Sequence, residues 1–233
     1  MLFAQKNQNC GENFIMGNSK MRLHKSYFLK NFNKRKVNFI TIDGITCSGK
    51  SVLANLLKIR LKKNFDSISI LSKDFFLLTR EKRISFTKKL KSNCLSQNKV
   101  HYDLKKLHYL LKFLNYGNKK NSLKLTNLYN RKTGKNNLSL NFKYSEKNLI
   151  ILEGIYVSQD LKKITKPLVN ILVIEKIYES LARKIERIRD KKISIQHVVT
   201  EFTKIHLQSF KYHLNKSKFD IVFADQDREF MPV

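Results

Sequence analysis

The chain has 233 residues, of which 42% are hydrophobic, and this suits one α/β domain with a sizeable core. No apolar run reaches the roughly 18 residues that cross a bilayer, which excludes a helical integral membrane protein. The net charge of +29 is typical of nucleic-acid binding. However, it is spread along the whole chain, and the 37 lysines against 10 arginines also fit an AT-rich coding sequence. We therefore expect neither a nucleic acid nor a membrane as partner.

Residues 1–36 form a basic segment that differs from the rest. They hold eight Lys or Arg residues and one acid, Glu12, without clear periodicity. Basic, acid-poor segments are typical of transit peptides, but the amphipathic Arg- and Ser-rich pattern is missing. We favour a disordered extension or a mis-assigned start, in which a later Met such as Met16 or Met21 is the true start. The expected location is the cytoplasm, or an organelle if residues 1–36 are a transit peptide.

Three cysteines, Cys10, Cys47 and Cys94, are odd in number and widely spaced. They form no paired motif, so neither a zinc site nor a disulfide framework is indicated. A reducing compartment fits this pattern best.

From residue 37 onwards, strand and helix patterns alternate. Strands are expected at residues 39–43, 67–74, 148–154, 169–175 and 219–223. Helices are expected from the glycine-rich loop to about residue 63, and at residues 102–114, 178–190 and 194–214. Asp103 is suited to cap the second of these helices. This order predicts an α/β domain over residues 37–233, with a parallel sheet flanked by helices.

Residues 117–147 depart from this rhythm. They hold eight basic residues, seven Asn and one acid, with short alternating patterns on either side of a turn at Thr133-Gly134-Lys135. The pattern predicts a β-hairpin flap inserted between a helix and the next core strand. A lysine-rich surface loop is the alternative.

The strongest motif is GITCSGKS, which follows the first strand and precedes a helix. Its G-x-x-x-x-G-K-S spacing predicts a P-loop, in which backbone N–H groups and the start of the helix bind phosphates. Lys50 would reach the β- and γ-phosphates, and Ser51 would bind Mg²⁺. The predicted nucleotide-binding residues are Gly44, Ile45, Thr46, Cys47, Ser48, Gly49, Lys50, Ser51 and Val52.

Two acids follow apolar strands. Asp74 ends the 67–74 strand, where it could accept a proton from an attacking hydroxyl or merely cap a helix. Glu153, in LIILEGIY, takes the position of an acid that helps hold Mg²⁺, although it could also be a simple loop acid. Because ligands bind at the carboxyl ends of parallel strands, both acids are candidates for one site.

The segment ARKIERIRDKK (182–192) predicts a basic lid over about residues 183–195. Arg183 and Arg187 are four residues apart and share a helix face. Cations there could stabilise charge on a transferring phosphoryl group. A solvated helix face is the alternative.

The order of these motifs resembles the uridine kinase/phosphoribulokinase family of P-loop kinases over about residues 37–224. SKDFFLL is similar to the family's D-x-F-Y segment, which implies that Asp74 is the general base and that Phe76 lies in the substrate site. TNLYNRKTGK resembles the flap segment, which implies that Tyr129 contacts the acceptor. LARKIERIRD resembles the lid, which places Lys184 and Arg187 at arginine positions.

The chain also departs from the family pattern. Gln97 stands where the family has an aspartate that binds the ribose diol, and the flap lacks its proline and has Asn130 in place of an aspartate. The lid lacks its usual E-R-G-R run. These differences concern the acceptor half of the site.

The resemblance implies an ATP- and Mg²⁺-dependent kinase acting on a small molecule. The favoured candidate for the acceptor is the 5′-hydroxyl of a pyrimidine nucleoside. Catalytic roles fall to Asp74, Lys50 and Arg187, substrate contacts to Asp74, Phe76, Tyr129 and Lys184, and metal binding to Ser51 and Glu153. The alternative candidate for the acceptor is a hydroxyl of nicotinamide riboside or of another sugar. A nucleic-acid-stimulated P-loop NTPase and a kinase-like protein without turnover are the remaining alternatives. A homo-oligomer is compatible with this reading.

Overall fold

The structure is a computed structural model that describes residues 13–16, 19–22, 32, 37–89, 101–116, 122–143, 148–188 and 194–224. Gln97, Arg189 and the basic residues at 191–192 lie outside the described residues, as does most of the segment 1–36. Within the described part no helix is both long and apolar enough to span a membrane.

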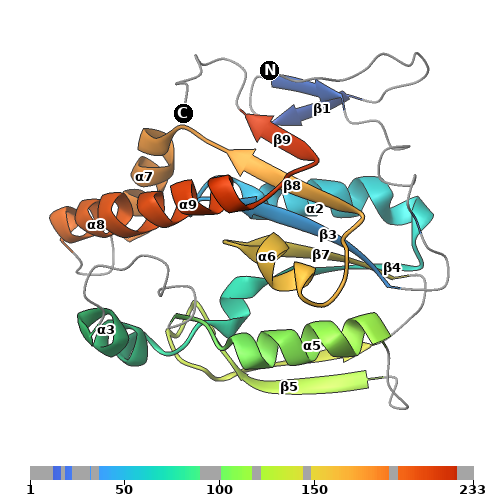
Figure 1. The fold of residues 1–233 in the computed structure, drawn as a ribbon, viewed down its shortest axis with the longest axis horizontal. Coiled ribbons are helices and arrows are strands. Elements are labelled where there is room, and N and C mark those ends of the chain that lie inside the picture. Colours follow the sequence, from blue (N-terminus) through green and yellow to red (C-terminus); the bar gives the residue numbers. More distant parts are fainter. Residues whose placement is uncertain are drawn as a thin grey trace.

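A five-stranded parallel sheet forms the centre of the molecule (Figure 1). Its spatial order is β4-β7-β3-β8-β9. The strands are β3 (Asn38–Gly44), β4 (Ser67–Ser72), β7 (Asn148–Gly154), β8 (Val169–Ile174) and β9 (Ile221–Ala224). Every residue of β3 and β7 is buried, which explains their continuous apolar runs. The predicted parallel α/β fold is confirmed.

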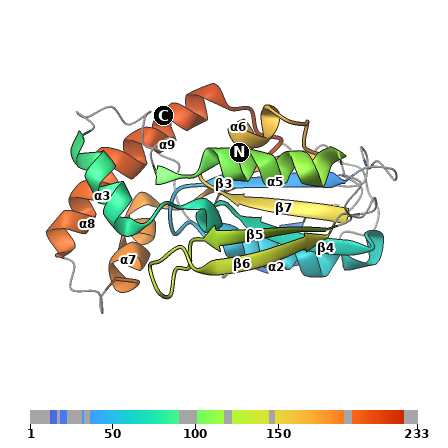
Figure 2. The same cartoon turned by 90° about the horizontal axis from the view of Figure 1, so that it is seen from below.

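Helices cover both faces of the sheet, as Figure 2 shows. One face packs on α2 (Lys50–Leu61), which continues into a 3₁₀ turn at Lys62–Asn64. The other face packs on α5 (Leu104–Tyr116) and α6 (Val157–Lys162). Asp103 caps α5 as predicted, because its Oδ1 accepts a hydrogen bond from the Lys106 N–H at 3.0 Å.

Four more helices lie in the described part of the chain, and His213 on the last of them lies against Asp43 on β3 and Gln159 on α6. They are α3 (Arg80–Lys89), α7 (Ile177–Glu186), α8 (Ile195–Glu201) and α9 (Gln208–Lys216). A π-helical turn at Phe202–Leu207 joins α8 to α9. The single helix predicted at residues 194–214 is therefore a helical run with a π-turn inside it, a feature that often marks functional positions.

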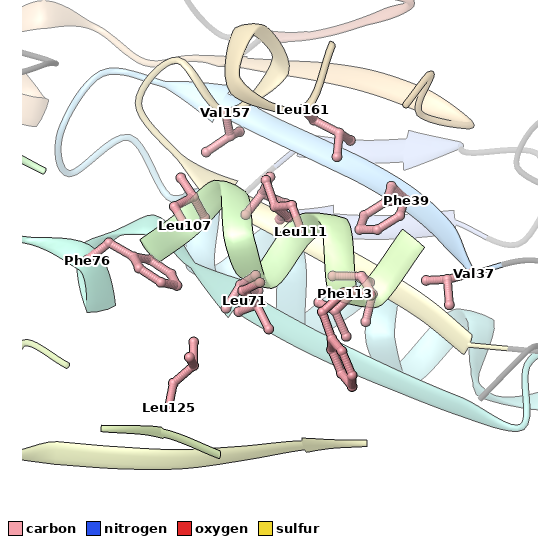
Figure 3. Close-up of a cluster of buried hydrophobic side chains, with 14 of the residues drawn as sticks. Val37, Phe39, Leu71, Phe76, Leu107, Leu111, Phe113, Leu125, Val157 and Leu161 are labelled. Atoms are coloured by element: carbon pink, nitrogen blue, oxygen red, sulfur yellow. The ribbon is translucent and has the colours of Figure 1, made fainter. Parts of the chain in front are cut away.

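The predicted flap is a hairpin of β5 (Ser122–Leu128) and β6 (Leu138–Lys143). Gly134 has φ +71° at its tip, so a turn with a left-handed residue forms where expected. Leu125 and Leu128 from β5 join the apolar cluster beneath α5, where Figure 3 shows Leu125 facing Leu71 and Phe76. The hairpin is thus anchored to the core, and the simple surface-loop alternative does not describe it.

Two described pieces fall within residues 1–36. A short antiparallel hairpin pairs β1 (Asn13–Met16) with β2 (Ser19–Arg22). The ring of Phe32 meets that of Phe65 edge-on, with centroids 4.9 Å apart. The sequence pattern predicted neither feature.

Candidate active site

The loop between β3 and α2 has the backbone that a P-loop needs. Gly49 has φ 86° and Cys47 has φ 64°, so the chain passes twice through the left-handed region. At Gly44, a Cβ would lie 2.6 Å from the Val173 carbonyl oxygen and 2.7 Å from Ser48 Oγ. A glycine is therefore required at this close approach. The buried Ser48 hydroxyl has no hydrogen-bond partner among the described atoms.

Lys50 lies across the loop. Its ammonium donates to the Ile45 carbonyl at 2.6 Å, and the side chain is 8% exposed. Burial lowers the pKa of Lys50, while the Glu153 and Asp74 carboxylates act in the opposite direction. A triphosphate in the loop would offer anionic oxygens in place of a neutral carbonyl, and this strengthens the hydrogen bond.

Ser51 and Glu153 meet beside the loop. The Ser51 hydroxyl donates to Glu153 Oε2 at 3.3 Å, because β7 lies next to β3 and both strands end at the same edge. A hydroxyl and a carboxylate oxygen are hard ligands of the kind that Mg²⁺ binds together with substrate phosphates. The predicted metal-binding residues therefore fit the ion, and Glu153 is a strand-end residue rather than a loop acid.

Asp74 follows the carboxyl end of β4, within a 3₁₀ turn at Lys73–Phe76. Ser72, not Asp74, caps this turn by accepting from the Asp74 N–H. Asp74 Oδ1 accepts a hydrogen bond from the Tyr102 hydroxyl at 3.5 Å, and Oδ2 forms an ion pair with Arg131 at the flap tip. Asp74 is thus a partly exposed side chain that faces the flap, and the alternative role as a helix cap falls to its neighbour.

A buried lysine fixes the strand ends that carry Asp74 and Glu153. Lys73 Nζ lies 2.6 Å from Asp160 Oδ2, and the two side chains are 0% and 2% exposed. It also donates to the Ile155 carbonyl at 2.8 Å, two residues after Glu153. Burial lowers the pKa of Lys73; burial opposes the charge of Asp160 too, but Lys73 outweighs it and lowers the Asp160 pKa. The ion pair joins the end of β4 to α6, and the hydrogen bond to Ile155 joins it to the segment that follows β7.

The flap residue Tyr129 lies against the Asp74 segment. Its N–H donates to the Phe75 carbonyl at 2.8 Å, and its hydroxyl accepts from Arg83 at 3.1 Å. The ring is 8% exposed. The structure places Phe76 differently from the expected substrate contact, because its ring is 1% exposed in the apolar core beneath α5 (Figure 3). Phe76 supports the site from inside.

The lid helix α7 approaches the P-loop through Arg183. Its guanidinium donates to Glu175 at 2.8 Å and reaches the Cys47 carbonyl at 3.5 Å. Lys184, expected in the substrate site, is bound instead to Glu201 at 2.7 Å. Arg187 ends α7 with an exposed side chain, and no side-chain contact to the P-loop is seen among the described residues. Among the lid cations that the structure describes, Arg183 is therefore the one that reaches the phosphate loop.

Glu201 joins the lid to the π-turn. Burial opposes its charge, but hydrogen bonding to His206 and the charge of Lys184 outweigh this and hold the Glu201 pKa well below its usual value. Nearby, burial together with Arg83 and His206 lowers the pKa of His101 to about 4. The contacts of Glu201 with Lys184 and His206 join α7 to α8 and the π-turn.

Behind the P-loop, Asp43 is completely buried on β3. Its Oδ2 accepts from the Ser158 N–H at 3.1 Å, and Nε2 of His213 lies 3.1 Å from Oδ1. His213 Nδ1 contacts the amide nitrogen of Gln159 at 2.9 Å. Because that nitrogen is a donor, we assign the acceptor role to Nδ1 and the ring proton to Nε2, on the side of Asp43. The network ties the strand before the P-loop to α6 and α9.

Four residues of this site were not among the predicted site residues: Lys73, Tyr102, Arg131 and Arg183. Arg131 and Arg183 stood in the predicted flap and lid, so the signal for them was the concentration of cations there. Lys73 is next to Asp74, but no sequence pattern marks a buried lysine.

No family model matches this sequence, and no curated protein matches it. Several solved structures, however, match the fold of this chain. A possible uridine kinase from Bacillus stearothermophilus is 16% identical with a TM-score of 0.59, over 84% of this chain and 92% of that one. A proposed fructose transport system kinase from Silicibacter sp. TM1040 is 18% identical with a TM-score of 0.62, over 85% and 96%.

A third match is the phosphoribulokinase from Rhodobacter spheroides, which is 13% identical with a TM-score of 0.54, over 82% of this chain and 71% of that one. At these identities the likeness is one of fold. The chain has the fold of P-loop kinases, and the resemblance predicted from its sequence is confirmed at that level.

Proposed function

We propose that the protein is an ATP-dependent kinase that phosphorylates a hydroxyl group of a small molecule. The observation that carries the proposal is the meeting of three groups at the carboxyl edge of the sheet: the P-loop with Lys50, the Ser51–Glu153 pair, and Asp74 beside them. A P-loop that only switches or hydrolyses needs no second carboxylate on the side of the flap.

In the proposed reaction, the acceptor hydroxyl oxygen forms a bond to the γ-phosphorus while the bond from that phosphorus to the β–γ bridging oxygen breaks. The hydroxyl proton goes to Asp74. Lys50 and Arg183 stabilise the negative charge on the phosphoryl oxygens. Mg²⁺, held through Ser51 and Glu153, would neutralise charge on the β- and γ-phosphates.

The acceptor suggested by the sequence resemblance is the 5′-hydroxyl of a pyrimidine nucleoside, with nicotinamide riboside or another sugar hydroxyl second. The structure supports a flap over the acceptor side. A second class of sugar acceptor, one that carries a negative charge, is favoured by the ion pair between Arg131 and Asp74.

The test is transfer of label from γ-labelled ATP to a panel of nucleosides, sugars and sugar acids, with the Asp74→Asn variant beside it. We expect turnover to fall by about 10²- to 10⁴-fold, with ATP binding retained. Asp66→Asn is the matched control, since this exposed residue lies at the opposite end of β4. Unchanged turnover in Asp74→Asn would remove the base assignment, and ATP hydrolysis stimulated by RNA without a phosphorylated product would overturn the kinase proposal.

A further inference from the structure

The flap places a guanidinium on the proposed base. Arg131 at the hairpin tip pairs with Oδ2 of Asp74, while Tyr102 donates to Oδ1. Arg131 is 60% exposed and Asp74 is 23% exposed. The ion pair therefore lies at the open side of the base, where an acceptor hydroxyl has to approach.

This arrangement follows from how the flap is held. The Tyr129 N–H donates to the Phe75 carbonyl at 2.8 Å, and Asn136 Nδ2 donates to the Leu77 carbonyl at 3.2 Å. Both contacts join the hairpin to the segment that carries Asp74. Because they lie on either side of the tip, they hold Arg131 over the base.

The hairpin is also strongly cationic. Residues 122–143 carry five Lys or Arg residues and no acid. Arg83 adds a second guanidinium beside it, at the Tyr129 hydroxyl. An approaching acceptor therefore meets positive charge on the flap side of Asp74, which attracts anions and repels cations.

The Arg131 guanidinium occupies the exposed side of Asp74 Oδ2, which an acceptor hydroxyl must reach. The pair between Arg131 and Asp74 is exposed, and such pairs contribute little to stability, so an exchange of partner is easy. A carboxylate or phosphate on the acceptor is the natural exchange partner, because both bind the planar guanidinium with two parallel hydrogen bonds.

We infer that the acceptor carries an anionic group, a carboxylate or a phosphate ester, in addition to its hydroxyl, and that this group draws Arg131 away from Asp74. The inference rests on the proposed kinase function and narrows its substrate class. A neutral nucleoside leaves Arg131 on Asp74 and is a poor acceptor. A cationic nucleoside such as nicotinamide riboside is poorer still.

Matched acceptor pairs test this. Each pair keeps a primary hydroxyl and differs in one anionic group: glycerol and glycerate for the carboxylate, fructose and fructose 6-phosphate, or uridine and uridine 3′-phosphate, for the phosphate. The wild type should prefer the anionic member of at least one pair by about tenfold or more in kcat/KM. The pair that shows the preference identifies the anion.

In Arg131→Gln, the ratio of kcat/KM between the anionic and the neutral member should fall close to one. Turnover of the neutral member should rise, because Asp74 no longer has Arg131 as its partner. Lys132→Gln is the control, since it removes an exposed cation from the same tip without touching Asp74. A preference that survives Arg131→Gln, or one that Lys132→Gln removes equally, overturns the inference.

Binding separates this inference from the proposed function. With a non-hydrolysable ATP analogue in the P-loop, calorimetric titration compares the two members of each pair in wild type and Arg131→Gln. Tighter binding of an anionic member that is lost in Arg131→Gln supports the inference even if no product forms, and in that case only the kinase proposal fails. Equal affinity, or no binding of either member of any pair, overturns the inference even if a product forms.

Discussion

Replacing Lys73 by Met should destabilise the protein more than almost any other single substitution. Lys73 and Asp160 are 0% and 2% exposed with 2.6 Å between the charged atoms. Removing the cation leaves a buried carboxylate, and the basic side chain that remains beside it is His108, whose Nε2 lies 3.9 Å from Asp160 Oδ1. Breaking one side of a buried ion pair costs about 3–5 kcal/mol, a large share of the roughly 5–15 kcal/mol that stabilises a domain.

The assay is urea unfolding followed by circular dichroism at pH 7. Lys162→Met is the control, because this exposed lysine lies on the same helix as Asp160, and its loss should change stability by about 0.5 kcal/mol or less. In the double variant Lys73→Met/Asp160→Asn, the buried carboxylate that lost its partner is replaced by a neutral amide. We expect it to recover at least about 2 kcal/mol of the loss.

The pH dependence gives a second check. In the wild type, Lys73 lowers the Asp160 pKa, so this stabilisation is present above the ordinary value of 3.8 and is lost as pH falls through the lower folded value. In Lys73→Met burial raises the pKa of the carboxylate with only His108 left to oppose it, so Asp160 becomes protonated at a higher pH than in the wild type. The deficit of the variant should therefore shrink from pH 7 to pH 5. A deficit under about 1 kcal/mol, or a double variant no better than the single one, would refute this reasoning.

Three further predictions concern the P-loop and His101. Gly44→Ala should abolish ATP binding in calorimetry while the circular dichroism spectrum is kept, because its Cβ would lie 2.6 Å from the Val173 carbonyl; normal affinity would contradict the tight cradle. His101 has a pKa of about 4 against an ordinary 6.5, so the unfolded chain binds more protons between these values and stability falls as pH drops through them. His101→Asn should flatten this slope in urea unfolding at pH 7 and 5, whereas the exposed control His197→Asn should keep it; equal slopes would show that His101 is not responsible. Cys47 is partly exposed in the loop, so a thiol reagent should abolish the proposed kinase activity, ATP should protect it, and Cys47→Ser should resist; a sensitive Cys47→Ser would point to another cysteine.

The sheet and the phosphate loop could be predicted because their signals are local. Apolar runs such as residues 148–154 specify buried parallel strands, and the glycine spacing specifies the loop whatever surrounds it. The meeting of Ser51 with Glu153 also followed, since the carboxyl ends of parallel strands share one edge.

The rest of the site depends on contacts between distant segments. A lysine just after a strand has the pattern of a surface residue, and only the packing of α6 against β7 shows that Lys73 is buried with Asp160. Arg183 and Arg187 share a helix face, so periodicity could not tell which one approaches Cys47. Phe76 resembled a substrate contact because its neighbour Asp74 faces the site, but its own ring points into the core.

The central position of β3 has a consequence for synthesis of the chain. Thr41 on β3 donates to Asn170 on β8 at 2.7 Å across 129 positions of sequence, and β7, the other neighbour, is also made late. During translation β3 and the P-loop leave the ribosome long before either flanking strand exists. Pairings of such long range are slow to form and leave apolar strands exposed meanwhile. We therefore expect a nucleotide in the P-loop to stabilise the protein only late in folding, once β7 and β8 have paired with β3.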